Sequence, residues 1–300
     1  MKKTRSLRLL LTGFFMGMAD LIPGVSGGTV AFISGIYEEL LESIKNVSSN
    51  VPRLLLKRKF ISAFKTVPYE FLVPLFLGIF AAIISLSRLL SSLIQNYPTY
   101  IWSFFFGLVL ASTWLVAKRI KSWNLKYFTC FIIGTLIGYF IVGQVPGTTP
   151  ETLPMFFLSG ALAIIAMILP GISGSFILLI IGKYAQILEA AKELNFVVLV
   201  TVMFGAVFGL ALFSRVLSWL FSKHHNISVA ILSGFMLGSV RKLWPWKEVL
   251  LTRMNSHGEI VPLIEKNILP NSFGLEVLFA IALMIVGVGI IVWIDRLKLD

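Results

Sequence analysis

The strongest constraint on this chain is an interruption containing proline and glycine that occurs twice, each time inside a long apolar stretch. The first copy reads Gly17-Met-Ala-Asp-Leu-Ile-Pro-Gly-Val-Ser-Gly-Gly-Thr29, and the second reads Met167-Ile-Leu-Pro-Gly-Ile-Ser-Gly-Ser175. A proline cannot continue the helix that precedes it, and glycines allow a tight turn. Lipid cannot satisfy the hydrogen-bonding groups of irregular backbone, so a break at membrane depth must face protein or a water-filled cavity.

The composition indicates that these stretches lie in a membrane. Hydrophobic residues make up 57% of the 300 residues and charged residues only 13%, whereas soluble domains contain roughly 25% charged residues. The net charge of +12 is typical of basic cytoplasmic loops beside anionic lipid headgroups. No soluble basic domain is present to bind nucleic acid. The single cysteine, Cys130, excludes an intrachain disulfide and a cysteine-based metal cluster, and we expect neither metal nor cofactor.

Six apolar segments have the length of a single membrane crossing, which needs ~20 residues. Two longer segments, 9–36 and 155–182, contain the breaks, and we predict that each is a re-entrant hairpin that enters and leaves on one side. The predicted fold is therefore an all-α polytopic membrane protein. The six predicted crossings are residues 71–94, 100–117, 127–143, 196–221, 227–243 and 274–294.

The distribution of charge favours re-entrant hairpins over two further crossings. With hairpins, most lysines and arginines lie on the side that holds both termini, and the linkers 95–99 and 144–154 on the opposite side contain neither residue. Basic loops are retained in the cytoplasm, so we predict a cytoplasmic (inner) membrane protein with both termini in the cytoplasm. The loop 245–272 fits this topology least well, because it lies outside and contains several basic residues.

The two halves of the chain, residues 1–145 and 146–300, align as a repeat. Each half contains one hairpin and an odd number of crossings, so the second half would insert in the opposite sense. Inverted repeats of this kind occur in many secondary transporters. The aligned pairs are Pro23 with Pro170, Ser26 with Ser173, Gly27 with Gly174, Tyr37 with Tyr184 and, after an insertion near 46–70, Gly78 with Gly205, Arg88 with Arg215 and Gly107 with Gly234.

Each break contains the residue types that bind an anion at the start of a helix. A serine is suited to cap the helix that follows, and free backbone N–H groups at the positive end of the helix dipole attract phosphate. The alternative is a pair of kinked helices packed through small residues, but repetition of the motif favours binding. The candidate residues are Gly24, Ser26, Gly27, Gly28 and Thr29 in the first copy and Gly171, Ser173, Gly174 and Ser175 in the second.

Two arginines, Arg88 and Arg215, lie inside predicted crossings at matching positions of the two halves. Placing an arginine at the centre of a membrane helix costs ~2.5–3.5 kcal/mol on insertion scales. A guanidinium group there would bind phosphate oxygens through two parallel hydrogen bonds. The alternative is that each side chain extends to the nearest membrane surface, which lowers the cost.

Asp20 is an acidic residue at membrane depth just before the first break, and the aligned residue of the second copy is Met167. An intramembrane carboxylate is a candidate site for coupling transport to protons or cations. The alternatives are a salt bridge to an arginine and a carboxylate at a helix end in contact with water. If Asp20 couples transport, the two halves differ in mechanism.

The two motif copies quoted above resemble the signature stretches of the bacterial polyprenyl-phosphate transporter family. The resemblance extends over nearly the whole chain, and it implies a translocase for undecaprenyl phosphate, the lipid carrier of cell-wall precursors. Such a protein returns the carrier from the outer to the inner leaflet. The resemblance supplies no residue roles. The second copy has Ser175 and Phe176 where the first has Gly28 and Thr29, so the two hairpins need not bind phosphate equally.

Other functions remain open on the residues alone. Broken helices and intramembrane arginines would also suit a transporter or channel for a small soluble anion. A membrane-embedded lipid phosphatase would need a nucleophile and a base, and no predicted crossing contains a histidine. A purely structural scaffold would not need paired breaks. The sequence contains no Walker A nucleotide-binding loop and no common hydrolase motif, so we do not expect an enzyme.

Overall fold

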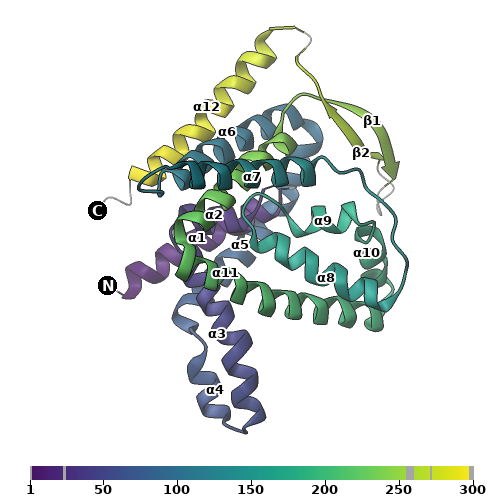
Figure 1. The fold of residues 1–300 in the computed structure, drawn as a ribbon. Coiled ribbons are helices and arrows are strands. Elements are labelled where there is room, and N and C mark those ends of the chain that lie inside the picture. The colour runs from purple at the N-terminus through teal and green to yellow at the C-terminus, as the bar shows by residue number, and fades with distance from the viewer. Residues whose placement is uncertain (1, 23–24, 255–259, 271, 297–300) are drawn as a thin grey trace.

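The computed structural model describes residues 2–22, 25–254, 260–270 and 272–296 (Figure 1). Pro23 and Gly24, which belong to the first break, lie outside the described residues. The elements are α1 (Lys2–Asp20), α2 (Gly27–Ile33), α3 (Tyr37–Leu56), α4 (Phe60–Thr66), α5 (Tyr69–Asn96), α6 (Pro98–Ala117), α7 (Leu125–Val142), α8 (Leu153–Ile168), α9 (Gly174–Ile180), α10 (Tyr184–Lys192), α11 (Phe196–Ser239), the 3-10 helix η1 (Val240–Leu243), β1 (Lys247–Met254), β2 (Ile260–Asn267) and α12 (Leu275–Arg296).

The described residues include five helices that are long and apolar enough to cross a membrane: α5, α6, α7, α11 extended by η1, and most of α12. Four of these contain one predicted crossing each. The fifth, α11, contains both 196–221 and 227–243, because two helices are joined at a kink where His224 leaves helical geometry (φ −136°, ψ 47°). Figure 1 shows α11 turning sharply at this kink. The prediction of a polytopic helical membrane protein is confirmed.

The two predicted hairpins each consist of a longer helix, the break, and a seven-residue helix that packs against the longer one. In the first, α1 packs against α2, and in the second α8 packs against α9. The second hairpin continues into α10 after a bend of 107° between α9 and α10, which is the geometry of a broken span or a re-entrant loop. Gly182 forms this bend with φ +72°, a conformation that glycine adopts without steric cost.

Closely packed glycines join the helices in matching ways in the two halves. In the first half, α1 crosses α5 where Gly13 and Gly78 lie against backbone of the opposite helix, and in the second half α8 crosses α11 at Gly160 and Gly205. Small residues allow helix backbones to approach closely, which is the main source of helix packing in lipid. A second matched pair of crossings joins α6 to α12 at Gly107 and Gly287, and α7 to α11 at Gly134 and Gly234.

The expectation of an all-helical chain is wrong for residues 247–254 and 260–267. This part of the predicted outer loop 245–272 contains a two-stranded antiparallel sheet in which β1 pairs with β2 from Lys247↔Asn267 to Met254↔Ile260. The base of this β-hairpin is closed by Trp244, whose Nε1 donates to the carbonyl oxygen of Ile268 at 2.8 Å. Figure 1 shows the β-hairpin at the upper right, while α3 and α4 project from the bottom of the view.

Candidate functional site

The first break is held by two local side chains. Ser26 has extended backbone geometry (φ −126°, ψ 135°) and caps α2, because its Oγ accepts a hydrogen bond from Gly28 N at 3.1 Å. The carboxylate of Asp20 accepts a hydrogen bond from Gly27 N at 2.7 Å. In the second break, Ser173 Oγ accepts from Phe176 N at 3.3 Å. The predicted caps Ser26 and Ser173 are therefore confirmed.

The two breaks meet directly. Ser26 Oγ donates a hydrogen bond to the carbonyl oxygen of Met167 at 3.1 Å, and Tyr37 Oη donates one to the carbonyl oxygen of Ile168 at 3.2 Å. These carbonyls belong to the last turn of α8, where a helix leaves its C=O groups without partners. A Cβ atom at Gly28 would lie 2.6 Å from the carbonyl oxygen of Ile168, so the contact requires glycine. The breaks thus form one partly buried junction between the two halves.

At this junction, backbone N–H groups that were predicted to bind phosphate donate hydrogen bonds to oxygen atoms of the protein itself. Gly27 N–H donates to Asp20, Gly28 N–H to Ser26 Oγ, and Thr29 N–H to the carbonyl oxygen of Ser26. The Oγ1 atom of Thr29 is different, because it is buried and has no hydrogen-bond partner among the described residues. A buried hydroxyl without a partner is unusual in a native protein. The Thr29 hydroxyl is therefore free to form a hydrogen bond with a ligand at the junction.

Neither predicted arginine contacts the junction in a described hydrogen bond or ion pair. Arg88 is exposed on α5, and Arg215 is exposed on α11. The Nε of Arg215 donates to Ser49 Oγ of α3 at 3.0 Å. The structure therefore brings the two breaks together but leaves Arg88 exposed on α5 and Arg215 exposed beside Ser49 of α3.

The end of α2 that points away from the junction is covered by basic and aromatic side chains. Arg119 Nη2 donates to the carbonyl oxygen of Ile33 at 3.2 Å, and its guanidinium lies over the ring of Phe32. The rings of Phe32, Tyr37 and Phe221 pack together next to this contact. These contacts separate the junction from the protein surface on this side.

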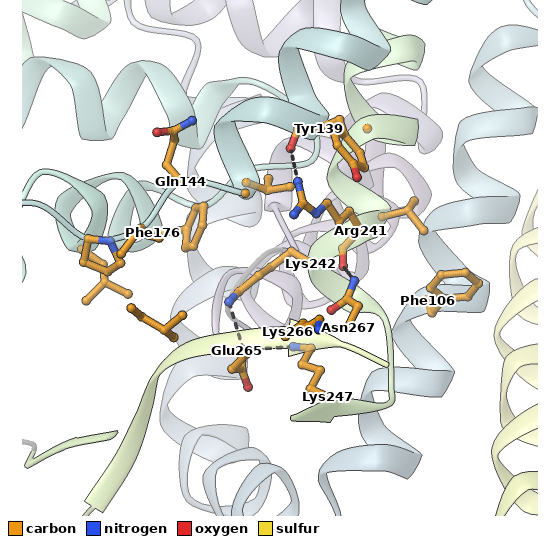
Figure 2. Close-up of a pocket in the computed structure, with 18 of the residues that line it drawn as sticks. Phe106, Tyr139, Gln144, Phe176, Arg241, Lys242, Lys247, Glu265, Lys266 and Asn267 are labelled. Carbon is orange, nitrogen blue, oxygen red and sulfur yellow. Dashed lines mark hydrogen bonds and ion pairs between the residues drawn. The ribbon is translucent and has the colours of Figure 1, made fainter. Parts of the chain in front are cut away.

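A cavity of about 770 Å³ lies between the β-hairpin and the neighbouring helices, and Figure 2 shows residues that line it. Its walls come from α6, α7, α9, the end of α11 with η1, and both strands. Phe176 of α9 is one wall, and it follows the second break by only a few residues. Figure 2 shows Lys242 and Lys247 converging on Glu265. The cavity therefore places basic side chains beside the second hairpin, although neither lysine belongs to a motif.

The charged side chains of the cavity are partly withdrawn from water. Glu265 Oε2 accepts from Lys242 Nζ at 3.1 Å and from Lys247 Nζ at 3.3 Å. The Lys247 side chain is only 7% exposed, and burial lowers its pKa to about 8 although Glu265 opposes the change. Burial alone would raise the pKa of Glu265, but the ammonium groups of Lys247 and Lys242 outweigh burial and hold that pKa below its usual value.

Aromatic rings also contact cations around the cavity. Arg241 lies over the ring of Tyr139, with 4.2 Å from its Cζ to the ring centroid, and Lys247 lies over Trp102 at 4.3 Å. From the sequence, Arg241 was expected at the outer end of the predicted crossing 227–243 and Lys247 in the outer loop 245–272, and neither was expected to bind the substrate. The available signal was the run Arg241-Lys-Leu-Trp-Pro-Trp-Lys247 directly after an apolar segment. Among the described residues, no group of three or more His, Cys, Asp or Glu side chains is placed to hold a metal ion.

Comparison with known proteins assigns the chain to a family. A family described as undecaprenyl phosphate translocase-like matches residues 16–261. The chain belongs to this family. The match includes both Pro-Gly motifs and the cavity residues Arg241, Lys242 and Lys247. It confirms the resemblance inferred from the motifs.

Two relatives of this family member carry the name polyprenyl-phosphate transporter. The protein from Vibrio cholerae serotype O1 is 41% identical over 301 residues, covering 98% of each chain. The protein from Staphylococcus aureus is 32% identical over 254 residues, covering 79% of this chain and 85% of the relative. No solved structure matches the chain. The names of both relatives describe transporters, in agreement with the expectation that the chain is not an enzyme.

Proposed function

We propose that this protein translocates undecaprenyl phosphate across the cytoplasmic membrane, from the outer to the inner leaflet, and so returns the lipid carrier for synthesis of cell-wall polymers. The observation that carries the proposal is the direct contact of the two Pro-Gly breaks through Ser26 and Met167 in a chain of this family. The polyprenyl tail is already soluble in the bilayer, so the charged headgroup is the barrier. Broken helices offer polar backbone to that headgroup at membrane depth.

The proposal includes an inverted repeat of residues 1–145 and 146–300, with both termini in the cytoplasm. The support is the matched set of glycine crossings. The α1–α5 crossing corresponds to the α8–α11 crossing, and the α6–α12 crossing corresponds to the α7–α11 crossing. Repeats related in this way allow one half to rock against the other around a fixed site. The junction between the breaks lies at the interface of the two halves, which the α6–α12 and α7–α11 crossings also join.

We further propose that the phosphate passes the two breaks during transport. The candidate ligands remain those named from the motifs: Gly24, Ser26, Gly27, Gly28, Thr29, Gly171, Ser173, Gly174 and Ser175. In the described conformation Asp20 holds the Gly27 donor, so a change at Asp20 is required before a phosphate binds there. Protonation of Asp20 would weaken that hydrogen bond, which is a direct way to couple transport to a proton gradient.

From the sequence, Arg88 and Arg215 were expected to bind the phosphate within the membrane. In this proposal they attract the headgroup at an earlier step. Both are exposed on helices that are apolar enough to cross a membrane. A guanidinium group on such a surface seeks phosphate oxygens, because lipid offers it no other counter-ion. We propose that the two arginines attract the headgroup at the surface of α5 and α11 before it reaches the breaks.

The test is reconstitution of the intact protein in liposomes with a short-chain polyprenyl phosphate, followed by a leaflet-accessibility assay. Parent protein should move the lipid between leaflets, and Gly28→Leu should abolish movement because the new side chain separates the breaks. Gly289→Leu is the matched control, since a Cβ there meets nothing within 4 Å. Arg88→Ala and Arg215→Ala should each slow transport, and parent rates in both would overturn their assignment.

The same liposomes distinguish the lipid from a soluble anion. Radiolabelled inorganic phosphate should not accumulate inside them, whereas the polyprenyl phosphate should change leaflet. Flux of inorganic phosphate without any movement of the lipid would overturn the proposed function and would indicate a transporter or channel for a small anion.

A further inference from the structure

The cavity between the β-hairpin and the neighbouring helices contains an excess of positive charge. Its lining includes the basic residues Arg241, Lys242, Lys247 and Lys266 and one acidic residue, Glu265. The Lys242 and Lys247 side chains are 26% and 7% exposed, respectively, so water balances their charge only in part. Desolvated cations are costly unless they are paired. An anionic ligand would therefore gain from entering this cavity.

Glu265 balances the charge of the two lysines only in part. A single oxygen, Oε2, accepts from both ammonium groups, so one negative charge is shared between two positive ones. A phosphate monoester carries about −1.5 to −2 charges at neutral pH and has three acceptor oxygens. It would provide a separate oxygen for each lysine.

We propose that this cavity is a binding site for a phosphate monoester headgroup, in which Lys242 and Lys247 donate to the phosphate oxygens and the carboxylate of Glu265 is the internal counter-ion that the phosphate displaces. The assignment rests on the proposed function, in which it is the site that receives the headgroup of the lipid before transport. No covalent step is involved.

The displacement requires only a side-chain movement. Asn267 Nδ2 donates to the carbonyl oxygen of Arg241 at 2.8 Å, and Ile268 N donates to the carbonyl oxygen of Trp246 at 3.0 Å. These bonds keep the end of β2 attached to η1 and to the segment between η1 and β1, independently of Glu265. The two lysines also keep their places when the carboxylate leaves, because Lys247 lies over Trp102 and Lys242 lies over Phe176 at 5.4 Å.

The other walls of the cavity suit a lipid better than a free phosphate. Phe106, Leu110, Leu179, Leu250 and Ile264 contribute apolar surface. Leu110 of α6 is 40% exposed and Leu250 of β1 is 52% exposed, so apolar surface continues from the cavity to the outside of the molecule. A polyprenyl chain could follow that surface while its phosphate stays on the lysines.

The first experiment measures binding to the purified full-length protein in detergent. The probes are farnesyl phosphate, inorganic phosphate and farnesol, which separate the headgroup from the tail. Farnesyl phosphate should bind more tightly than either of the others. Equal binding of inorganic phosphate and farnesyl phosphate would assign the site to a soluble anion and overturn the lipid assignment. Binding of farnesol as tight as that of farnesyl phosphate would overturn the role of the lysines.

Variants then test the residues. Lys242→Ala and Lys247→Ala should each weaken farnesyl phosphate binding about tenfold, the cost of one lost hydrogen bond to a charged group, with Lys65→Ala on α4 as the control. Glu265→Gln should strengthen binding several-fold because the competing carboxylate is gone, whereas Glu248→Gln on the exposed side of β1 should leave it unchanged. Weaker binding in Glu265→Gln would overturn the displacement.

Failure of the cavity site can be told apart from failure of the proposed translocase function. Lysine variants that bind and transport like the parent overturn this site and leave the translocase intact. Parent protein that binds farnesyl phosphate through Lys242 and Lys247 but never moves the lipid between leaflets would retain the site and overturn the translocase. Circular dichroism and thermal unfolding of each variant show whether a loss of binding reflects a loss of folding.

Discussion

Ser26 and Met167 form a hydrogen bond across the two halves of the protein, with 3.1 Å between the serine Oγ and the methionine carbonyl oxygen. The same Oγ accepts from Gly28 N at 3.1 Å, so one hydroxyl group caps the start of α2 and the end of α8 together. Movement of one half relative to the other changes the bond to Met167, whereas the bond from Gly28 N lies within the first half. This serine therefore links the geometry of one break to that of the other.

Replacing Ser26 with alanine should lower the free energy of unfolding by about 1 kcal/mol, the usual value of a helix N-cap, and should slow lipid transport. Ser222→Ala is a suitable control, because that hydroxyl is exposed and donates only within its own helix. Thermal unfolding in detergent and the leaflet assay measure the two effects. Unchanged transport in a destabilised Ser26→Ala protein would show that the bond is structural only.

Thr29→Val separates stability from function at the junction. The Thr29 hydroxyl is buried without a partner among the described residues, so removing it at nearly constant shape should leave the free energy of unfolding equal or slightly higher. Transport should fall, since we propose that this hydroxyl binds the passing phosphate. Parent transport in Thr29→Val would remove Thr29 from the substrate path.

Asp20→Asn tests coupling to protons. The asparagine retains an oxygen that can accept from Gly27 N–H, so the break should keep its shape. It cannot exchange a proton, and we expect stimulation of transport by an imposed pH gradient to disappear while a basal rate remains. Measurement of transport in liposomes with and without the gradient gives the comparison. Stimulation equal to that of the parent would assign Asp20 to capping alone.

Two glycines on α12 provide a matched test of helix packing. A Cβ at Gly287 would collide with the carbonyl oxygen of Phe104, whereas a Cβ at Gly289 meets nothing within 4 Å. Gly287→Ala should therefore destabilise the protein by about 1–3 kcal/mol, as overpacking commonly does. Gly289→Ala should be neutral or stabilising by up to about 1 kcal/mol, because alanine favours a helix. Equal unfolding temperatures would contradict the α6–α12 contact.

Binding of the phosphate should depend on pH through Lys247. Burial lowers the pKa of Lys247 to about 8, below the usual value of about 10.4. As pH rises through about 8 the free protein loses this positive charge, so affinity for farnesyl phosphate should fall. The facing groups are Glu265, whose lowered pKa keeps it ionised, Lys242, and Glu276 of α12 in the adjoining cavity.

Lys247→Arg provides the control for this pH dependence, because arginine stays protonated at every accessible pH. The variant should bind with little change between about pH 7 and 9, where the parent weakens. A parallel decline in both proteins would assign the titration to another group, and Glu265→Gln then shows whether the carboxylate contributes.

Local features of the membrane helices follow from the sequence. Long apolar runs give α5, α6, α7 and α12, since a helix satisfies its own backbone in lipid. Proline stops α8 at Ile168, and a serine after each break caps the next helix. These properties depend on neighbours within a few positions along the chain, so residue type and spacing are enough to determine them.

Only the tertiary structure decides which distant groups meet. The hydrogen bond from Ser26 to Met167 and the sharing of Glu265 by Lys242 and Lys247 depend on how helices and strands pack. The same packing leaves Arg88 exposed on α5 and places Arg215 beside Ser49 of α3, although their matched positions suggested that both bind phosphate. Spacing along a helix determines which residues share a face, but the partner of that face is set by the fit of side chains across the interface.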